Sequence, residues 1–451
     1  MHLKPTIAFS LFGCALLAAA SAQPWRVPAV MKRLDNGLTV LVSEDHSAPT
    51  FGLCLVYGIG FRLEPKGRTG FAHLFEHMMF EGTPNAPKGT FDRVIEGGGG
   101  ADNGATRWDF TEYIEWAPVS ALEQVLWLEA DRMKTLDFAQ KNLENQRSVV
   151  EEEVRVNVLN QPYGLFFAID LPMKAFDKYP NSHNFYGDFK DLDAATLDDV
   201  RDFYLRYYAP NNAVLAVAGD VKPDDVFASV EKYFAGLPRR DVPPKPDVSE
   251  SPQTAERRGT EKDAHAGVPA LAIGYRMPPR DSHDAVVAAV TGELLHNGDA
   301  SRLYQALVKE KKVAINISGG LNWPLGTPFE YDGPTLLTSF IEYPPGVPEP
   351  KLEAAYDEVV RALTADGPSD RELDRIRAKI RSDWYGRLEL PVNRASALAH
   401  ATLFDGKPDR INELPDELAR VTSAEVKAFA AKYLVRTNRT VLDRVPAGGR
   451  P

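Results

Sequence analysis

The chain has 451 residues, of which 44% are hydrophobic, 10% aromatic and 25% charged. Apolar content in this range is typical of a folded globular protein and excludes disorder over most of the chain. The length is sufficient for two or more domains. The formal net charge of −11 argues against a nucleic-acid-binding protein, because such a protein needs a basic surface to neutralise phosphates. Two cysteines are too few for a disulfide framework.

Residues 1–22 have the pattern of an export signal. Lys4 supplies a positive start, residues 7–20 form an apolar run, and small residues end the segment at Ala22. The run is shorter than the roughly 20 residues that a transmembrane helix needs, and no other stretch predicts a membrane span. A lipoprotein signal fits less well, because the apolar run continues past Cys14. The sequence therefore predicts cleavage after residue 22 and export to the periplasm.

A proline-rich segment divides the rest of the chain into two pieces of similar size. Its prolines lack the backbone donor that a helix or central strand requires, so we expect an extended linker. The segments that begin at Thr196 and Thr422 align with an offset of 226 residues, and share a threonine cap, helical apolar positions and a following strand-like run. This repeat indicates a duplicated domain. The predicted boundaries are residues 23–237, a linker at 238–258, and residues 259–451.

The first half mixes strand and helix patterns. Apolar and β-branched runs at 38–42 and 51–56 predict strands. Glycines precede an apolar helix that starts near Phe71, and long helices are expected at 119–138 and 143–159. The predicted fold class is α+β, with two homologous halves.

The candidate chemistry lies in the sequence His-Leu-Phe-Glu-His, which supplies His73, Glu76 and His77. Residues four apart share a helix face, so both imidazoles can reach one ion, and Glu76 lies on the same side. Zn²⁺ suits two imidazoles and a carboxylate, with a position left for water. Zinc lowers the pKa of such a water to about 7, and Glu76 would act as the general base. The spacing is the inverted form of the zincin motif.

A third metal ligand must come from elsewhere in the chain. The acidic helix predicted at 143–159 contains Glu151, Glu152 and Glu153, of which only one can face inward. Helical periodicity favours Glu153, which lies in line with Gln146. Periodicity does not exclude the other two, and a solvated charge run is the alternative interpretation.

These residues resemble the M16 metallopeptidases. In that family the His-x-x-Glu-His motif is followed about 75 residues later by a glutamate that ends an R-x-V-V-x-x-E pattern, which residues 147–153 match. The resemblance extends almost throughout the chain after the signal, through residues 98–113, 207–212, 219–220 and 301–304. It implies that Glu153 is the third ligand, that each chain binds one Zn²⁺, and that the second half has similar topology but no metal site.

The resemblance also implies how a peptide binds. In the family, the segment that corresponds to Asn103, Gly104, Ala105 and Thr106 is a strand whose edge pairs with the backbone of an extended substrate. Such pairing tolerates many sequences. Gln146 stands where many members have a second acid, which supports the ligands from outside the coordination shell. We expect this difference to tune activity without abolishing it.

The second half departs from the family pattern. Active members with two such halves carry an arginine and a tyrosine that hold the substrate and the scissile carbonyl, where this chain has Val308 and Ile315. We therefore expect the chain to be the zinc subunit of a clam-shell heterodimer, whose second M16-like subunit supplies the arginine–tyrosine pair. A homodimer is the alternative.

The predicted activity is zinc-dependent endopeptidase cleavage of extended peptides or unfolded polypeptides. The alternative is a noncatalytic peptide-binding or assembly subunit that retains zinc, against which the intact Glu76 argues, because a structural site needs no base. Cys54 is expected to be a small buried hydrophobe. Structural or exposed roles are expected for the histidines at other positions, namely His46, His183, His265, His283, His296 and His400.

Overall fold

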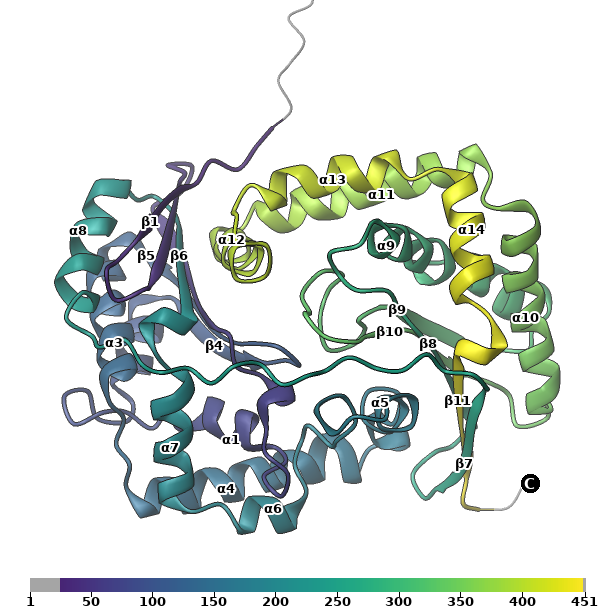
Figure 1. Ribbon diagram of the computed structural model, residues 1–451, viewed down its shortest axis with the longest axis horizontal. Helices are drawn as coiled ribbons and strands as arrows, with labels where there is room; N and C mark the ends of the chain where they lie inside the picture. The colour runs from purple at the N-terminus through teal and green to yellow at the C-terminus, as the bar shows by residue number, and fades with distance from the viewer. Residues whose placement is uncertain (1–24, 449–451) are drawn as a thin grey trace, which may run out of the picture.

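The computed structural model describes residues 25–448, which form two α+β halves that lie side by side (Figure 1). The predicted export signal at 1–22 lies outside the described residues. Within them, no helix combines the length and apolar character needed to cross a membrane.

The first half is built on a six-stranded sheet with the order β1-β2-β6-β3-β5-β4. β3 pairs antiparallel with both β5 and β6, whereas β2 pairs parallel with β6. Seven of the eight β3 residues are buried, because both faces of this central strand are covered. The strands are β1 (Val30–Arg33), β2 (Thr39–Glu44), β3 (Thr50–Tyr57), β4 (Ala101–Thr106), β5 (Thr111–Pro118) and β6 (Ala213–Gly219).

The helices of the first half include both long helices that the sequence predicts. The first begins at Leu122 and ends at Lys134, short of the predicted range, and the second is followed by a π-helical segment, η4 (Arg155–Leu159). The helices are α1 (Phe71–Met78), α2 (Thr90–Ile95), α3 (Leu122–Lys134), α4 (Gln140–Val154), α5 (Asp170–Ala175), α6 (Phe189–Asp193), α7 (Leu197–Tyr207) and α8 (Pro223–Phe234).

The second half repeats this topology. Its five strands have the order β7-β11-β8-β10-β9, which corresponds strand for strand to β2-β6-β3-β5-β4, and the parallel pair β7–β11 matches β2–β6. The strands are β7 (Arg257–Asp263), β8 (Ala270–Arg276), β9 (Asn316–Leu321), β10 (Leu336–Glu342) and β11 (Arg439–Pro446). The helices are α9 (His283–His296), α10 (Glu349–Asp366), α11 (Asp370–Leu388), α12 (Pro391–Asp405), α13 (Arg410–Arg420) and α14 (Ser423–Tyr433). Two homologous α+β halves are therefore confirmed.

The 226-residue offset is visible in atomic detail. α7 and α14 each begin with a capping box, in which the side chain of Thr196 or Thr422 accepts a hydrogen bond from the third residue of its helix. After each helix, an asparagine amide donates to a tyrosine carbonyl at 2.8 Å, from Asn212 in the first copy and Asn438 in the second. The chain then enters β6 or β11. The same local interactions therefore build both copies.

Each half sends a helix onto the sheet of the other. α12 of the second half packs on β3 and β6, and α5 of the first half packs on β8 and β11. Figure 1 shows α12 beside the first sheet and α5 beside the second. Gly52 in β3 permits this approach, because a Cβ atom there would lie 2.1 Å from the backbone nitrogen of Val392. The two halves consequently share apolar cores rather than touching only at their surfaces.

The proline-rich segment is extended and crosses from one half to the other (Figure 1). Residues 238–256 form neither helix nor strand, and β7 begins at Arg257, within the predicted linker. The segment is held against the first half, because Glu250 accepts hydrogen bonds from the backbone nitrogens of Asp177 and Lys178 at 3.0 and 3.1 Å.

Candidate metal centre

A buried carboxylate holds the start of α1, the helix that carries the His-x-x-Glu-His motif. Glu64 accepts hydrogen bonds from the backbone nitrogens of Gly70 and Ala72 at 3.0 and 2.8 Å. A carboxylate at this position satisfies free N–H groups and complements the helix dipole. His183 Nε2 lies 3.0 Å from the same carboxylate and orients it. Neither residue was expected to support the site, because neither has a sequence spacing that links it to the motif.

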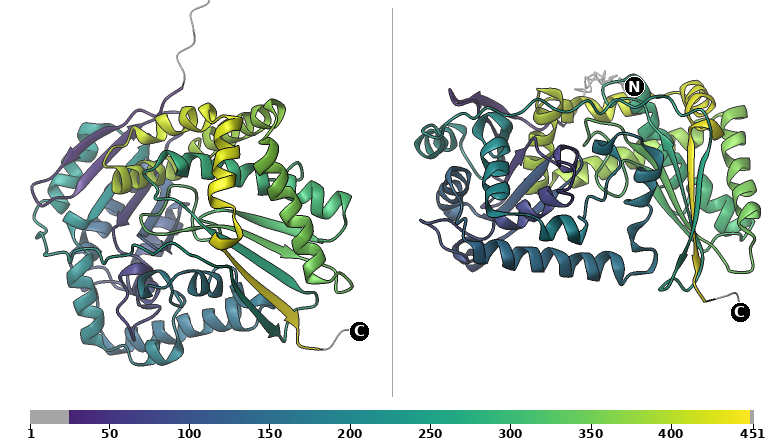
Figure 2. Two further views of the ribbon diagram at one scale, coloured as in Figure 1. Left: turned by 45° about the vertical axis from the view of Figure 1, so that its right-hand side comes forward. Right: turned by 60° about the horizontal axis from the view of Figure 1, so that its bottom comes forward.

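The structure brings His73, His77 and Glu153 together. Both histidines project from α1, with their Nε2 atoms 3.2 Å apart. Glu153 projects from α4, which packs against α1, and its Oε2 lies 3.5 Å from His73 Nε2 and 3.3 Å from His77 Nε2. The three side chains are 12%, 22% and 29% exposed, respectively, so a ligand can reach them. Figure 2 shows α4 running along the base of the molecule, from the first half toward the second.

The two neighbouring glutamates face elsewhere. Glu151 and Glu152 lie 3.0 and 3.4 Å from nitrogens of the Arg155 guanidinium, one turn further along the chain. Glu153 is therefore the member of the acidic run that faces the histidine pair.

The donor set fits a divalent zinc-class ion. Two imidazole nitrogens and one carboxylate oxygen converge within 4.8 Å of one another. Hydrogen bonds from His73 and His77 hold the pKa of Glu153 well below its usual range. Burial opposes protonation of His73, but Glu153 and Glu76 together raise its pKa above the ordinary value. These donor atoms lie so close together that, without an ion, protons must lie between them. One divalent cation bound at this point would take the place of those protons.

Glu76 lies between the histidine pair and the free edge of the first sheet. Its Oε2 accepts a hydrogen bond from Thr106 Oγ1 at 2.5 Å. Gly104 leaves room for the carboxylate, because a Cβ atom there would lie 3.0 Å from Glu76 Oε1. Both residues belong to β4, the terminal strand of its sheet, together with the exposed Asn103 and the half-buried Ala105. The structure thus places the predicted substrate strand directly against the candidate base.

Further side chains complete the surroundings. Tyr186 packs edge-on against His73, with ring centroids 5.4 Å apart, and the Asn157 amide lies 3.4 Å from Glu153 Oε1. Sequence reasoning missed both residues.

Gln146 donates a hydrogen bond to the buried Glu81, which follows α1, and so joins α4 to the end of the motif helix. Its contact with Glu81 gives Gln146 a structural connection to the site.

Val308 and Ile315, where the family resemblance places an arginine and a tyrosine, lie in the second half. Val308 belongs to a π-helical segment, η8 (Tyr304–Glu310), and packs partly buried against the second core. Ile315 directly precedes β9 and is 48% exposed. Neither side chain can donate a hydrogen bond to a substrate carbonyl.

Comparisons with known proteins match both halves of the chain. Residues 39–184 match the family model described as insulinase (peptidase family M16), and residues 194–380 match the model described as peptidase M16 inactive domain. The zinc protease PqqE of Helicobacter pylori is 29% identical over 373 residues, which cover 81% of each chain. A crystal structure of a protease from Helicobacter pylori superimposes with a TM-score of 0.86 at 24% identity, and covers 94% of this chain and 100% of that one.

The periplasmic protease PqqL from Escherichia coli gives a TM-score of 0.73 at 19% identity. This match covers 92% of the present chain but only 47% of PqqL. At these identities the structural matches show the fold, whereas the two family models together cover most of the chain and show the family. The chain belongs to the M16 peptidase family.

Proposed function

We propose that the chain is an exported zinc-dependent endopeptidase that cleaves extended peptides or unfolded polypeptides. One observation carries this proposal: the His73, His77 and Glu153 donors converge beside Glu76, which lies against the free strand edge of β4. The His-x-x-Glu-His motif would contribute two ligands and the base, and Glu153 the third ligand. The predicted domains, 23–237 and 259–451 after the export signal at 1–22, are part of this proposal.

The residues divide the chemistry between them. Zn²⁺ bound by the three donors would polarise a peptide carbonyl and lower the pKa of a water molecule to about 7. Glu76 takes the proton of the attacking water and later delivers it to the leaving amine. The Thr106 hydroxyl occupies one carboxylate oxygen of Glu76, so the other oxygen is the one that receives the proton.

The β4 edge positions the substrate. An extended peptide that pairs with Asn103, Gly104, Ala105 and Thr106 would run past Glu76, because Gly104 and Thr106 both lie against that side chain. Main-chain pairing of this kind grips peptides of many sequences.

A second subunit completes the proposed enzyme. Val308 and Ile315 occupy the positions where the family resemblance places an arginine and a tyrosine, so a partner with this pair would hold the scissile carbonyl. PqqL supports the idea, because this chain matches about half of that longer protein. The proposed assembly is a clam-shell heterodimer that encloses the peptide. The periplasm is the proposed location, in keeping with the predicted export signal.

Replacing Glu76 by Gln tests the proposed chemistry. The amide cannot accept the proton, so cleavage of an unfolded protein substrate should fall by about 10²–10⁴-fold. Zinc content, measured by atomic emission on the purified protein, should stay at the wild-type value. Glu96→Gln, at an exposed position on the first half, is the matched control and should keep full activity.

The same measurement separates the two candidate functions. Equal cleavage by wild type and Glu76→Gln would contradict the role of Glu76. Absence of cleavage by the wild type, both alone and with its partner, would favour a noncatalytic peptide-binding or assembly subunit.

A further inference from the structure

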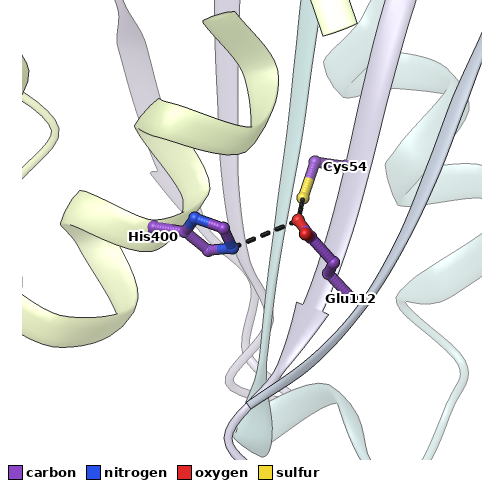
Figure 3. A group of neighbouring side chains, drawn as sticks. All are labelled: Cys54, Glu112 and His400. Atoms are coloured by element: carbon purple, nitrogen blue, oxygen red, sulfur yellow. Dashed lines mark hydrogen bonds and ion pairs between the residues drawn. The ribbon is translucent and has the colours of Figure 1, made fainter. Parts of the chain in front are cut away.

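A second group of metal-ligating side chains lies between the two halves, away from the residues assigned to catalysis. Cys54 projects from β3, Glu112 from β5 and His400 from α12 (Figure 3). Glu112 Oε2 lies 3.5 Å from Cys54 Sγ and 3.1 Å from His400 Nε2, and the three ligand atoms lie within 4.8 Å of one another. Sequence reasoning missed this cluster, because Cys54 and His400 come from opposite ends of the chain.

Strand pairing explains why two of the three residues meet. In the β3–β5 register, Glu112 lies opposite Val56, and Cys54 is two residues from Val56 on the same strand. Side chains two residues apart share a face of a sheet, so Cys54 and Glu112 point to the same side. That side is the face covered by α12, which brings His400 to them.

Carboxylates face both ring nitrogens of the buried histidine. His400 is 5% exposed, and its Nε2 points toward Glu112 Oε2 at 3.1 Å. Its other ring nitrogen, Nδ1, lies 3.3 Å from Glu330 Oε1. A carboxylate that holds the far nitrogen of an imidazole is the usual support of a metal-binding histidine.

We propose that Cys54, Glu112 and His400 form a second, structural binding site for a zinc-class divalent ion. A thiolate, an imidazole and a carboxylate suit Zn²⁺ or Co²⁺, whereas Mg²⁺ and Ca²⁺ prefer oxygen donors alone. Binding releases the proton of the Cys54 thiol and one proton of the His400 imidazolium. One divalent ion replaces two protons, so the net charge of this buried cluster does not change.

The site would join the two halves of the chain. Two of its ligands belong to the first sheet and the third to α12, which the second half lays across that sheet. A bound ion would therefore fix the position of α12 on β3, independently of whether the other centre catalyses peptide cleavage.

Cobalt substitution tests the proposal. The double variant His73→Ala/His77→Ala removes the candidate catalytic centre, and Cys14→Ser in the same chain leaves Cys54 as the sole cysteine. Titration of this metal-free protein with Co²⁺ should give a thiolate-to-cobalt charge-transfer band that saturates at one ion per chain. The band reports a cysteine ligand directly, and the assay needs no change in the cluster.

Two further variants identify the ligands. Cys54→Ser and His400→Gln in the same background should each abolish the band. His296→Gln removes another buried histidine, whose Nε2 lies 2.7 Å from Ser339 Oγ, and should leave the band intact. Absence of a charge-transfer band in the folded His73→Ala/His77→Ala protein, with folding checked by circular dichroism, would overturn the proposal. So would a band that persists in Cys54→Ser.

Discussion

Glu151, Glu152 and Glu153 are consecutive on α4, yet their side chains have different surroundings. The first two face Arg155, and the third lies 3.3 Å from His77 Nε2. Helical periodicity favours Glu153 as the inward residue but does not exclude the other two. The contact between α1 and α4 decides the matter, because it brings the histidine pair to the face that carries Glu153.

Neutralising these glutamates should have unequal effects on zinc affinity. Glu153→Gln removes a proposed ligand, so zinc affinity should fall by at least about tenfold, the lower bound for loss of even a supporting residue. Glu152→Gln, at a side chain that is 65% exposed, should leave affinity unchanged. Competition with a chromophoric chelator measures both values. Equal affinities in the two variants would contradict the assignment of Glu153.

At the scale of secondary structure elements, the contact between α12 and β3 depends on a missing side chain. A Cβ atom at Gly52 would lie 2.1 Å from the nitrogen and 2.3 Å from the Cα of Val392, and backbone cannot move aside as a flexible side chain can. The pattern of the β3 sequence predicts a strand, but only the neighbouring helix explains why this position is glycine.

Gly52→Ala should therefore destabilise the protein by about 1–3 kcal/mol, the usual cost of overpacking. Gly236→Ala is the matched control, because a Cβ atom there meets nothing within 4 Å, and we expect a change within about 0.5 kcal/mol. Urea unfolding followed by circular dichroism measures both. Wild-type stability of Gly52→Ala would mean that α12 does not pack this closely on the sheet.

At the scale of the whole molecule, the described residues form two related halves but contain a single candidate catalytic centre. The second half contributes α12 to the packing of the first sheet, whereas it has Val308 and Ile315 where the family resemblance places an arginine and a tyrosine. This asymmetry is the reason for proposing a partner subunit.

Restoring the pair should make the chain less dependent on a partner. Loss of one hydrogen-bond donor to a developing oxyanion lowers the rate by about 10²–10³-fold, so the purified wild type should cleave slowly. If the chain self-associates, Val308→Arg/Ile315→Tyr should raise kcat/KM at least tenfold. Adding Glu76→Gln to this variant should remove the gain. Light scattering gives the oligomeric state. Full-rate cleavage by the wild type alone, as a monomer or homodimer, would contradict the heterodimer.

Much of the molecule follows from local sequence. Sequence pattern predicts the features that form through nearby residues. They are the Thr196 and Thr422 caps, the asparagines that follow those helices, and the strands at 39–44 and 50–57. The spacing of His73, Glu76 and His77 likewise depends on one helix turn. These features require no knowledge of distant contacts.

The sequence by itself determined the α+β class, the duplication, and the motif that supplies two histidines and a glutamate. Only the tertiary structure decided that Glu64 and His183 hold the motif helix, that Gly52 admits α12, and that Cys54, Glu112 and His400 meet between the halves. The physical reason is separation along the sequence. Helix caps and periodicity depend on residues only a few positions apart. These contacts instead join segments far apart in the sequence, which meet only when the two sheets and the helix exchanged between the halves pack together.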